Sequence, residues 1–250
     1  MMEQAVKQMN EEMLKSALIR ADKNEDSVIK ETALNNVFIL SGDGSKKLVT
    51  KNLAPGIKVN DEKLITIDNE EYRIWEPFRS KLAVLILKGS SLSVKNDSSF
   101  LYLGAANGTT VSHISDIVHD GIVFAVEISP RAMKDLVRVS IPRRNLIPIL
   151  ADAMNPESYK NMVTEVDFIY QDIAQREQAS IAIKNAQFFL KKNGILVLMI
   201  KAKSIDSIKR SKDLMGNEIE KLEDFFKVEE LFDLEPFHSD HMAVVARKIC

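Results

Sequence analysis

The chain has 250 residues, of which 45% are hydrophobic and 28% charged, and its net charge is −2 at pH 7. This balance is ordinary for a globular protein of one large domain, with or without a small one, and it argues against strong unaided binding to nucleic acid, which normally needs a basic surface. No apolar run approaches the roughly 20 residues of a membrane helix, and we expect no secretory signal. The single cysteine, Cys250, cannot form an intramolecular disulfide. These features together predict a cytoplasmic location.

The first 34 residues are mostly polar and contain neither glycine nor proline. Apolar residues recur there three or four positions apart, which predicts a short amphipathic helix through Val6, Met9, Met13 and Ala17. A charged stretch follows, compatible with a linker or a second helix. We therefore expect residues 1–34 to form an N-terminal extension that is helical or disordered.

Residues 35–76 carry the signals of short strands. The segments "VFIL" and "KLVT" flank "SGDGS", whose residues tolerate the positive φ of a hairpin turn. A Pro-Gly turn follows in "LAPGIKV", and then "KLITI" and "EYRIW" have the composition of strands. The pattern predicts a small antiparallel β domain. It is too small to be very stable alone, so we expect it to pack on the main domain.

Strands and helices alternate through the rest of the chain, residues 77–250, which opens with Pro77 at a position suited to the first turn of a helix. The apolar strands "FLYLG", "IVFAVEI", "LIPIL", "VDFIYQD" and "GILVLMIKA" are separated by helical patterns, for example over residues 175–190 and 209–226. This order predicts an α/β domain with a doubly wound, mostly parallel sheet covered on both faces. The segments "KVEELFDLEP" and "HMAVVARKI" predict a closing antiparallel pair.

The stretch "LYLGAANGTTVSHISD", residues 101–116, breaks an apolar strand with small residues and opens a helix on hydroxyls. Such a break is typical of a backbone that comes very close to a ligand. Gly104 and Gly108 are four residues apart and lack the close glycine pair of the dinucleotide fingerprint, which favours a nucleoside over a pyrophosphate. A plain turn between strand and helix is the alternative. His113, within the helix, is expected to have a packing or capping role.

Charged side chains follow the next four strands. Glu127 ends the second strand, where a carboxylate can accept both ribose hydroxyls of a nucleoside. Asp152 ends the third strand, where it can accept from an adenine amino group, and Ala153 leaves room for the ring. Asp172 and Lys201 follow the fourth and fifth strands, so we expect them at the same rim of the sheet. Each could alone be a helix cap or a solvated group, but together they predict a ligand site.

Two further features are weaker. His238 and His241 are three residues apart, but this spacing on a loop or strand start is a poor signal for a metal, and we predict no metal site. Lys81 precedes the apolar face of a predicted helix. Its side chain is either a solvated cation or, if it points into the pocket, part of the site.

These residues together resemble the fibrillarins, the S-adenosylmethionine-dependent RNA 2′-O-methyltransferases of box C/D ribonucleoproteins, and in particular the archaeal form. The resemblance covers about residues 37–248. Its motifs occur in family order: "TKNLAPG", "YRIWEPFRSKL", "YLGAANGTTVSHISD", "FAVEISPR", "NLIPILADA", "DIAQ", "IKAKSID" and "LEPFHSDHMAVV". No Gly/Arg-rich arm precedes them, unlike in the eukaryotic form. The resemblance implies a Rossmann-like methyltransferase domain and methyl transfer to a guide-selected ribose 2′-hydroxyl.

The resemblance also implies the site residues. The family's catalytic Lys-Asp-Lys-His set falls on Lys81, Asp172, Lys201 and His241. The family's contacts to S-adenosyl-L-methionine fall on Thr109, Thr110, Glu127, Ile128, Asp152, Ala153, Asp172, Ile173, Ala174 and Gln175. To these we add Gly104, from the close backbone approach expected at the turn after the first strand. Departures from the family pattern are small: Asn107, Ile128 and Arg176 stand where the family commonly has Ser, Phe and Pro.

A ribose 2′-hydroxyl is a poor nucleophile, so its proton must leave near the time of attack. We expect Lys201 to take that proton or to stabilise the developing alkoxide. Asp172 is expected to orient Lys201, and His241 to position the ribose.

The partners implied by the resemblance are a Nop-domain scaffold protein, a kink-turn-binding ribosomal-type protein, a box C/D guide RNA and the target rRNA or tRNA. Because the guide selects the nucleotide, an acidic chain need not read bases. Basic residues near the rim can touch phosphates or form a solvated helix face: Lys201, Lys203, Lys209, Arg210 and Lys212. Three alternatives stay open: a nicotinamide-dependent oxidoreductase, a non-catalytic assembly subunit, and a stand-alone methyltransferase for small molecules or proteins.

Overall fold

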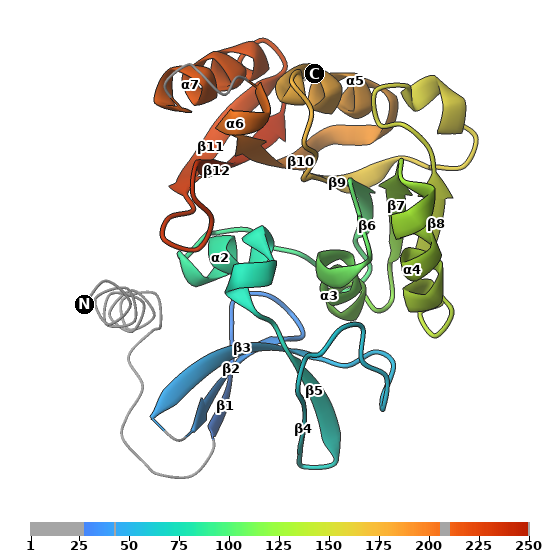
Figure 1. The fold of residues 1–250 in the computed structure, drawn as a ribbon, viewed down its shortest axis with the longest axis vertical. Helices are drawn as coiled ribbons and strands as arrows, with labels where there is room; N and C mark the ends of the chain where they lie inside the picture. The colour runs from blue at the N-terminus through green and yellow to red at the C-terminus, as the bar shows by residue number, and fades with distance from the viewer. Residues whose placement is uncertain (1–27, 43, 206–210, 250) are drawn as a thin grey trace.

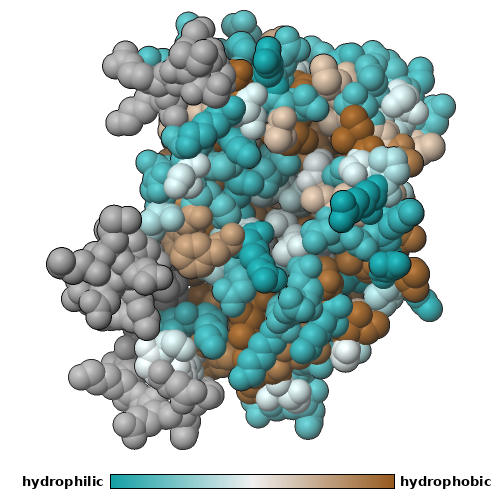
Figure 2. Space-filling model, viewed as in Figure 1, coloured by the Kyte–Doolittle hydropathy of each residue, from teal (hydrophilic) through white to brown (hydrophobic). Residues whose placement is uncertain are grey.

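The computed structural model describes residues 28–42, 44–205 and 211–249, which form two β-sheets (Figure 1). A five-stranded sheet comes first in the chain, and a seven-stranded sheet flanked by helices follows. Hydrophilic residues dominate the face shown in Figure 2, and apolar residues are exposed there in smaller patches. No helix within the described ranges is long and apolar enough to cross a membrane.

The small sheet is antiparallel throughout, as expected from its turn-rich sequence. Its strands are β1 (Val28–Glu31), β2 (Val37–Gly42), β3 (Ser45–Lys51), β4 (Leu64–Ile67) and β5 (Glu70–Ile74), in the order β1-β2-β3-β5-β4. Asp68 and Asn69 turn the chain between β4 and β5 with φ of 51° and 64°. Asp and Asn tolerate this left-handed region better than other side chains, which is why the hairpin closes there.

The small sheet begins earlier in the chain than the sequence indicates. Strand β1 lies inside residues 1–34, the segment expected to be a helical or disordered extension, and it pairs antiparallel with β2. Its four residues, "VIKE", are too few to show the two-residue alternation of a strand, so pairing with β2 determines their conformation. The amphipathic helix predicted around Met9 lies outside the described residues.

The large sheet is doubly wound and mostly parallel, which confirms the expected fold class. Its order is β11-β12-β10-β9-β6-β7-β8. The strands are β6 (Ser99–Leu103), β7 (Ile122–Glu127), β8 (Leu146–Leu150), β9 (Val166–Gln171), β10 (Leu190–Lys201), β11 (Phe226–Asp233) and β12 (His241–Lys248). The last two form the expected antiparallel pair. The chain runs from β6 to β7 and β8 on one side, and β9 lies on the other side. The switch point between β6 and β9 is where such sheets bind ligands.

Helices cover both faces of the large sheet. Along β6, Phe100 and Tyr102 face one core, which α2, α3 and α4 complete, whereas Leu101 and Leu103 face the other, which α5 and α7 complete. Figure 1 shows α2 and α3 between the two sheets. The helices are α2 (Lys81–Leu87), α3 (Thr109–Ile117), α4 (Pro130–Ser140), α5 (Gln178–Phe189), α6 (Ala202–Ile205) and α7 (Ser211–Leu222), with short 3₁₀ helices η1 (Pro77–Arg79) and η2 (Pro156–Tyr159).

A buried ionic cluster joins the small sheet to the large one. Asp116 of α3 accepts from Arg73 of β5 at 2.8 Å and from Arg143, which follows α4, at 2.5 Å. The two guanidinium side chains are 1% exposed and the carboxylate is 0% exposed. Thr50 of β3 also donates to Asp116, at 2.8 Å. Because one carboxylate is shared by side chains of both parts of the chain, this cluster fixes how the two sheets meet.

His113 of α3 is buried at the same junction. Its ring stacks on Trp75 with the centroids 4.7 Å apart, and its Nδ1 lies 2.8 Å from the Thr50 hydroxyl. This agrees with the packing role expected from the sequence. Burial, with the nearby charges of Arg73 and Arg143, holds the pKa of His113 well below its usual value of 6.5.

Acid is therefore expected to destabilise the fold through His113. Below the usual pKa of 6.5 the unfolded chain takes up a proton that the folded chain resists. The free energy of unfolding then falls with decreasing pH, by up to about 1.4 kcal/mol per pH unit for one group. Urea unfolding of the wild type and of His113→Gln at pH 7 and pH 5 measures this. The variant should lose less stability over the interval, and an equal loss in both proteins would remove His113 as the cause.

Candidate functional site

The turn after β6 brings its backbone against the end of β9. Gly104 has φ of +84°, and a Cβ at this position would lie 2.5 Å from the backbone oxygen of Asp172. Both the left-handed backbone and the close contact require glycine. Gly108, with φ of +97°, then leads into α3. The small residues of "GAANG" thus let two strand ends approach each other at the switch point.

A cavity of about 260 Å³ opens at the carboxyl ends of β6, β7, β8 and β9, and we call it the rim cavity. It brings together all the predicted cofactor contacts except Thr109 and Thr110. Its lining comprises Gly104, Ala106, Val126, Glu127, Ile128, Ala151, Asp152, Ala153, Met154, Asp172, Ile173, Ala174 and Gln175.

Two carboxylates of the rim cavity are held by backbone N–H groups. Glu127, which is 8% exposed, accepts from Ala106 at 2.8 Å through Oε2 and from Ser129 at 2.7 Å through Oε1. Asp152 accepts from Met154 at 2.9 Å through Oδ1. A carboxylate has about four acceptor positions, so both groups keep capacity for a ligand while their orientation is fixed.

Thr109 and Thr110 lie outside the rim cavity. The Thr110 hydroxyl donates to Ser80 at 3.1 Å, and the Thr109 hydroxyl accepts from Asn60 at 2.8 Å. These bonds tie the start of α3 to the turn before α2 and to the loop before β4. Their role as cofactor contacts remains a prediction that rests on the resemblance alone.

An ion pair between Lys81 and Asp172 stands at the edge of the rim cavity. The Lys81 ammonium lies 2.8 Å from Oδ1 and 2.7 Å from Oδ2 of Asp172, and the side chains are 16% and 24% exposed. Lys81 begins α2, which Ser80 caps by accepting from Ala83, and Asp172 directly follows β9. The sequence instead led us to expect Asp172 to orient Lys201. The actual partner is 91 residues away in the chain, so no local pattern marks it.

Lys201 and His241 face each other across β10 and β12. Directly opposed residues of an antiparallel pair project from the same face of the sheet, so these two members of the predicted set are neighbours. His241 Nδ1 lies 2.7 Å from the Ser239 carbonyl and donates to it, so Nε2 is the acceptor of the neutral ring. Over the described ranges, no side-chain hydrogen bond joins Lys201 to Asp172.

His241 also lies within electrostatic reach of the ion pair. Burial lowers its pKa below 6.5, the hydrogen bond to Ser239 opposes this, the Lys81 ammonium lowers the pKa further and Asp172 raises it. The ring is therefore neutral at pH 7. The structure thus gathers Lys81, Asp172, Lys201 and His241 from four separate elements at one edge of the sheet.

His238 is a residue of this site whose role the sequence did not reveal. Its Nε2 donates to the Pro77 carbonyl at 2.9 Å, and its ring centroid lies 6.0 Å from that of His241. It therefore ties the loop before β12 to the turn before Lys81. The only sequence feature that drew attention to His238 was its spacing from His241. The described residues contain no group of three or more side chains that could hold a metal ion.

Comparison with known proteins extends this picture. The fibrillarin family model matches residues 28–249. The chain is 50% identical over 206 residues to a fibrillarin-like rRNA/tRNA 2′-O-methyltransferase of Methanosarcina barkeri, covering 81% of this chain and 91% of that relative.

Two solved structures are similar over most of their length. Aeropyrum pernix fibrillarin, in complex with natively bound S-adenosyl-L-methionine, has a TM-score of 0.81 and 40% identity over 89% of this chain and 100% of that one. A fibrillarin/Nop5p complex gives a TM-score of 0.79 and 43% identity over 86% of this chain and 98% of the other. With the switch-point cavity and the gathered Lys-Asp-Lys-His set, these matches show that the chain belongs to the fibrillarin family.

Proposed function

We propose that this chain is the catalytic subunit of a box C/D guide ribonucleoprotein. It transfers the methyl group of S-adenosyl-L-methionine to a guide-selected ribose 2′-hydroxyl of rRNA, with tRNA as a second substrate class. The Lys81–Asp172 pair beside the rim cavity carries the proposal. The relative from M. barkeri, named as a 2′-O-methyltransferase, supports it.

The rim cavity suits S-adenosylmethionine, which the A. pernix relative binds. Gly104 forms part of the cavity wall and packs closely against the Asp172 backbone, Glu127 offers acceptor positions to a ribose diol, and Asp152 offers them to an adenine amino group. Ala153, which is 8% exposed, leaves space for the ring beside Asp152. When bound, the cofactor supplies a methyl group on a positively charged sulfur, which is already an electrophile.

The chain's own residues must then orient the ribose hydroxyl and manage its proton. The Asp172 oxygens accept hydrogen bonds and can fix the direction of the hydroxyl. The ammonium groups of Lys81 and Lys201 stabilise the negative charge that develops on the attacking oxygen. His241, neutral at pH 7, offers Nε2 as a proton acceptor. In this scheme Lys201 acts as the electrostatic stabiliser rather than as the base.

The family supports the partners in this proposal. The relative solved with Nop5p supports a Nop-domain scaffold protein. A kink-turn-binding protein and a box C/D guide RNA rest on the resemblance of the motifs, and the lone cysteine, Cys250, supports the cytoplasm as the compartment.

A reconstituted particle tests the proposal. The full chain is assembled with a Nop-domain protein, a kink-turn-binding protein, a guide RNA and a complementary target, and supplied with radiolabelled S-adenosylmethionine. We expect one ribose 2′-O-methyl group at the nucleotide that the guide specifies, and a shifted guide should move it. A particle that assembles without methylating its target would favour the assembly-subunit alternative, and binding of a nicotinamide cofactor in place of S-adenosylmethionine would favour the oxidoreductase.

A Gly104→Ala substitution is expected to weaken S-adenosylmethionine binding by tenfold or more, because the new methyl group meets the Asp172 backbone at 2.5 Å and must displace the wall of the rim cavity. Gly89→Ala is the matched control, since Gly89 has nearly the same φ, +83°, but open space around it. Calorimetric titration should show ordinary affinity for the control. Equal affinities in both variants would mean that the cofactor does not use this wall.

A further inference from the structure

An exposed aromatic side chain lies in η1, the short helix that leads to Lys81 of the Lys81–Asp172 pair. Phe78 of η1 is 55% exposed, and its ring lies 5.0 Å from that of Phe237, tilted by 57°. We call these two rings the aromatic platform. A single exposed ring is ordinary on a protein surface, so its meaning depends on its surroundings.

The platform is fixed to the predicted catalytic set on two sides. Phe78 precedes Lys81 by three residues, at the turn that leads into α2. Phe237 precedes His238, which donates to the Pro77 carbonyl and lies within electrostatic reach of Lys81 and Asp172. The two rings and the ion pair therefore belong to one continuous edge of the molecule.

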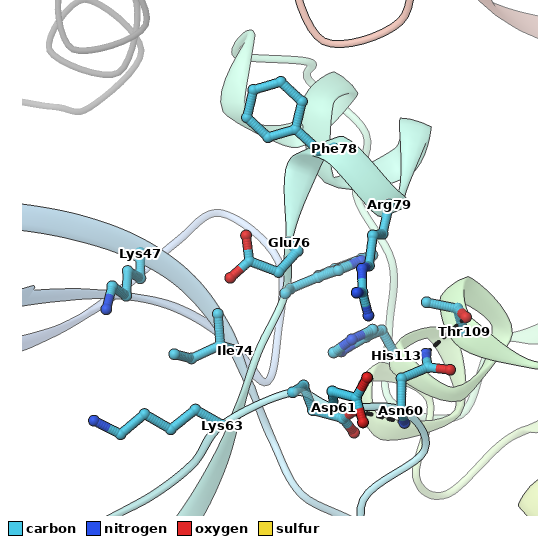
Figure 3. Close-up of a pocket in the computed structure, with 12 residues that line it drawn as sticks. Lys47, Asn60, Asp61, Lys63, Ile74, Glu76, Phe78, Arg79, Thr109 and His113 are labelled. Atoms are coloured by element: carbon cyan, nitrogen blue, oxygen red, sulfur yellow. Dashed lines mark hydrogen bonds between the residues drawn. The ribbon is translucent and has the colours of Figure 1, made fainter. Parts of the chain in front are cut away.

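The next residue, Arg79, points in a different direction. In Figure 3 it extends toward His113 and Thr109 of α3, in a second cavity of about 470 Å³ that Phe78 also lines from its opposite end. No ion pair or hydrogen bond of the Arg79 side chain occurs within the described ranges. The carboxylates that line the second cavity are Asp61, Glu62 and Glu76, of which Glu62 is engaged with Arg73 at 3.0 Å.

We propose that the aromatic platform binds a nucleoside of the substrate RNA, next to the ribose presented to the Lys81–Asp172 pair, and that Arg79 contacts a phosphate of the same strand. This inference rests on the proposed function and deepens it. Every base has a flat π-face, so an aromatic ring binds RNA without reading its sequence. Such binding suits an enzyme whose target nucleotide is chosen by a guide.

The charges favour RNA over a protein as the occupant. Arg79 and Lys81 follow Phe78 in η1 and at the start of α2, and Lys201 pairs with His241, whose ring lies 6.0 Å from that of His238, the residue after Phe237. These cations are local, because the chain as a whole has a net charge of −2. Local positive charge interleaved with aromatic rings is the pattern that binds single nucleic-acid strands. Two rings alone also fall short of the 20–30 residues that a standard protein interface contributes from each side.

The test compares three variants of the full chain in the reconstituted particle. Phe78→Ala removes the ring and Phe78→Tyr restores one. Phe188→Ala is the matched control, because Phe188 of α5 is 40% exposed and lies against Phe189 with centroids 5.8 Å apart. We expect Phe78→Ala to raise KM for the target RNA about tenfold, the range for losing one stacked base. The affinity for S-adenosylmethionine should stay unchanged, and the other two variants should behave as wild type.

The salt dependence of RNA binding distinguishes the contribution of the Phe78 ring from that of the Arg79 charge. Arg79→Gln should lower the slope of log affinity against log salt by about one, because one phosphate contact is lost. Phe78→Ala should leave that slope as in the wild type. An Arg79→Gln variant with an unchanged slope would overturn the phosphate contact.

Photo-crosslinking tests the platform independently of turnover. Target RNA carrying 5-bromouridine beside the selected nucleotide is irradiated in the wild-type particle, and the peptide that contains Phe78 should carry the adduct, which Phe78→Ala should lose. An unchanged KM in Phe78→Ala, or loss of the Nop-domain protein from that variant's particle, would overturn the inference. A wild-type particle without methyl transfer would instead defeat the proposed function, and the crosslink would still decide whether the platform binds RNA.

Discussion

Replacing Lys81 by methionine is expected to slow methyl transfer by about 10²- to 10⁴-fold, the range seen when a charge-stabilising or proton-managing group is removed. The affinity for S-adenosylmethionine should be largely retained, because Lys81 does not line the rim cavity. Its ammonium holds both oxygens of Asp172. Methionine keeps most of the apolar stem but removes the charge. The slower rate would therefore come from poorer orientation of the reacting hydroxyl and weaker stabilisation of the charge that develops on it.

Single-turnover rates in the reconstituted particle measure this effect, and calorimetry measures cofactor affinity. Lys88→Met is the matched control, since Lys88 caps the opposite end of the same helix. The control should react at the wild-type rate. A Lys81→Met rate within a few-fold of the wild type would remove Lys81 from the chemistry, whereas lost cofactor affinity would place its role in binding.

Replacing Asp116 by alanine is expected to cost about 3–5 kcal/mol of unfolding free energy, as when one partner of a buried ion pair is removed. Arg73 would keep its ion pair with Glu62, but Arg143, whose side chain is 1% exposed, would be left without an ion pair among the described residues. Thr50 would lose its acceptor as well. The contact between the two sheets would weaken, because Asp116 binds groups from both parts.

Urea denaturation of the full chain measures that loss. Asp135→Ala is the control, because Asp135 pairs with Arg138 at 3.1 Å on the exposed face of α4, with side chains 54% and 77% exposed. Such surface pairs contribute at most about 1 kcal/mol. A loss of comparable size in both variants would show that the buried cluster does not hold the sheets together.

The sequence predicted the elements of the fold well because most of them show a local pattern. Strands such as β6 and β10 are near-continuous apolar runs, and their helices are amphipathic. Strand β1 was not predicted because four residues are too few to show the alternation of a strand. Its conformation depends on pairing with β2, which is a tertiary contact. The position of β12 between β10 and β11 was also open, because an antiparallel pair can add to an edge in either order.

The same division holds for the site. Glu127 and Asp152 could be placed from the sequence, because residues that close parallel strands lie at one rim, and both line the rim cavity. The partner of Asp172 could not be predicted from the sequence, since the choice between Lys81 and Lys201 depends on how α2 packs across the sheet. The bonds of Thr110 to Ser80 and of His238 to Pro77 likewise join distant segments.

A crystal structure of the full chain with bound S-adenosylmethionine would show whether the rim cavity holds the methyl donor beside the Lys81–Asp172 pair. We expect the adenosine in the rim cavity, with its ribose at Glu127 and its adenine at Asp152, and the methyl group directed toward the Lys81–Asp172 pair. An adenosine bound in the second cavity beneath Arg79, or a methyl group directed away from that pair, would show that these side chains do not act on the transferred methyl group.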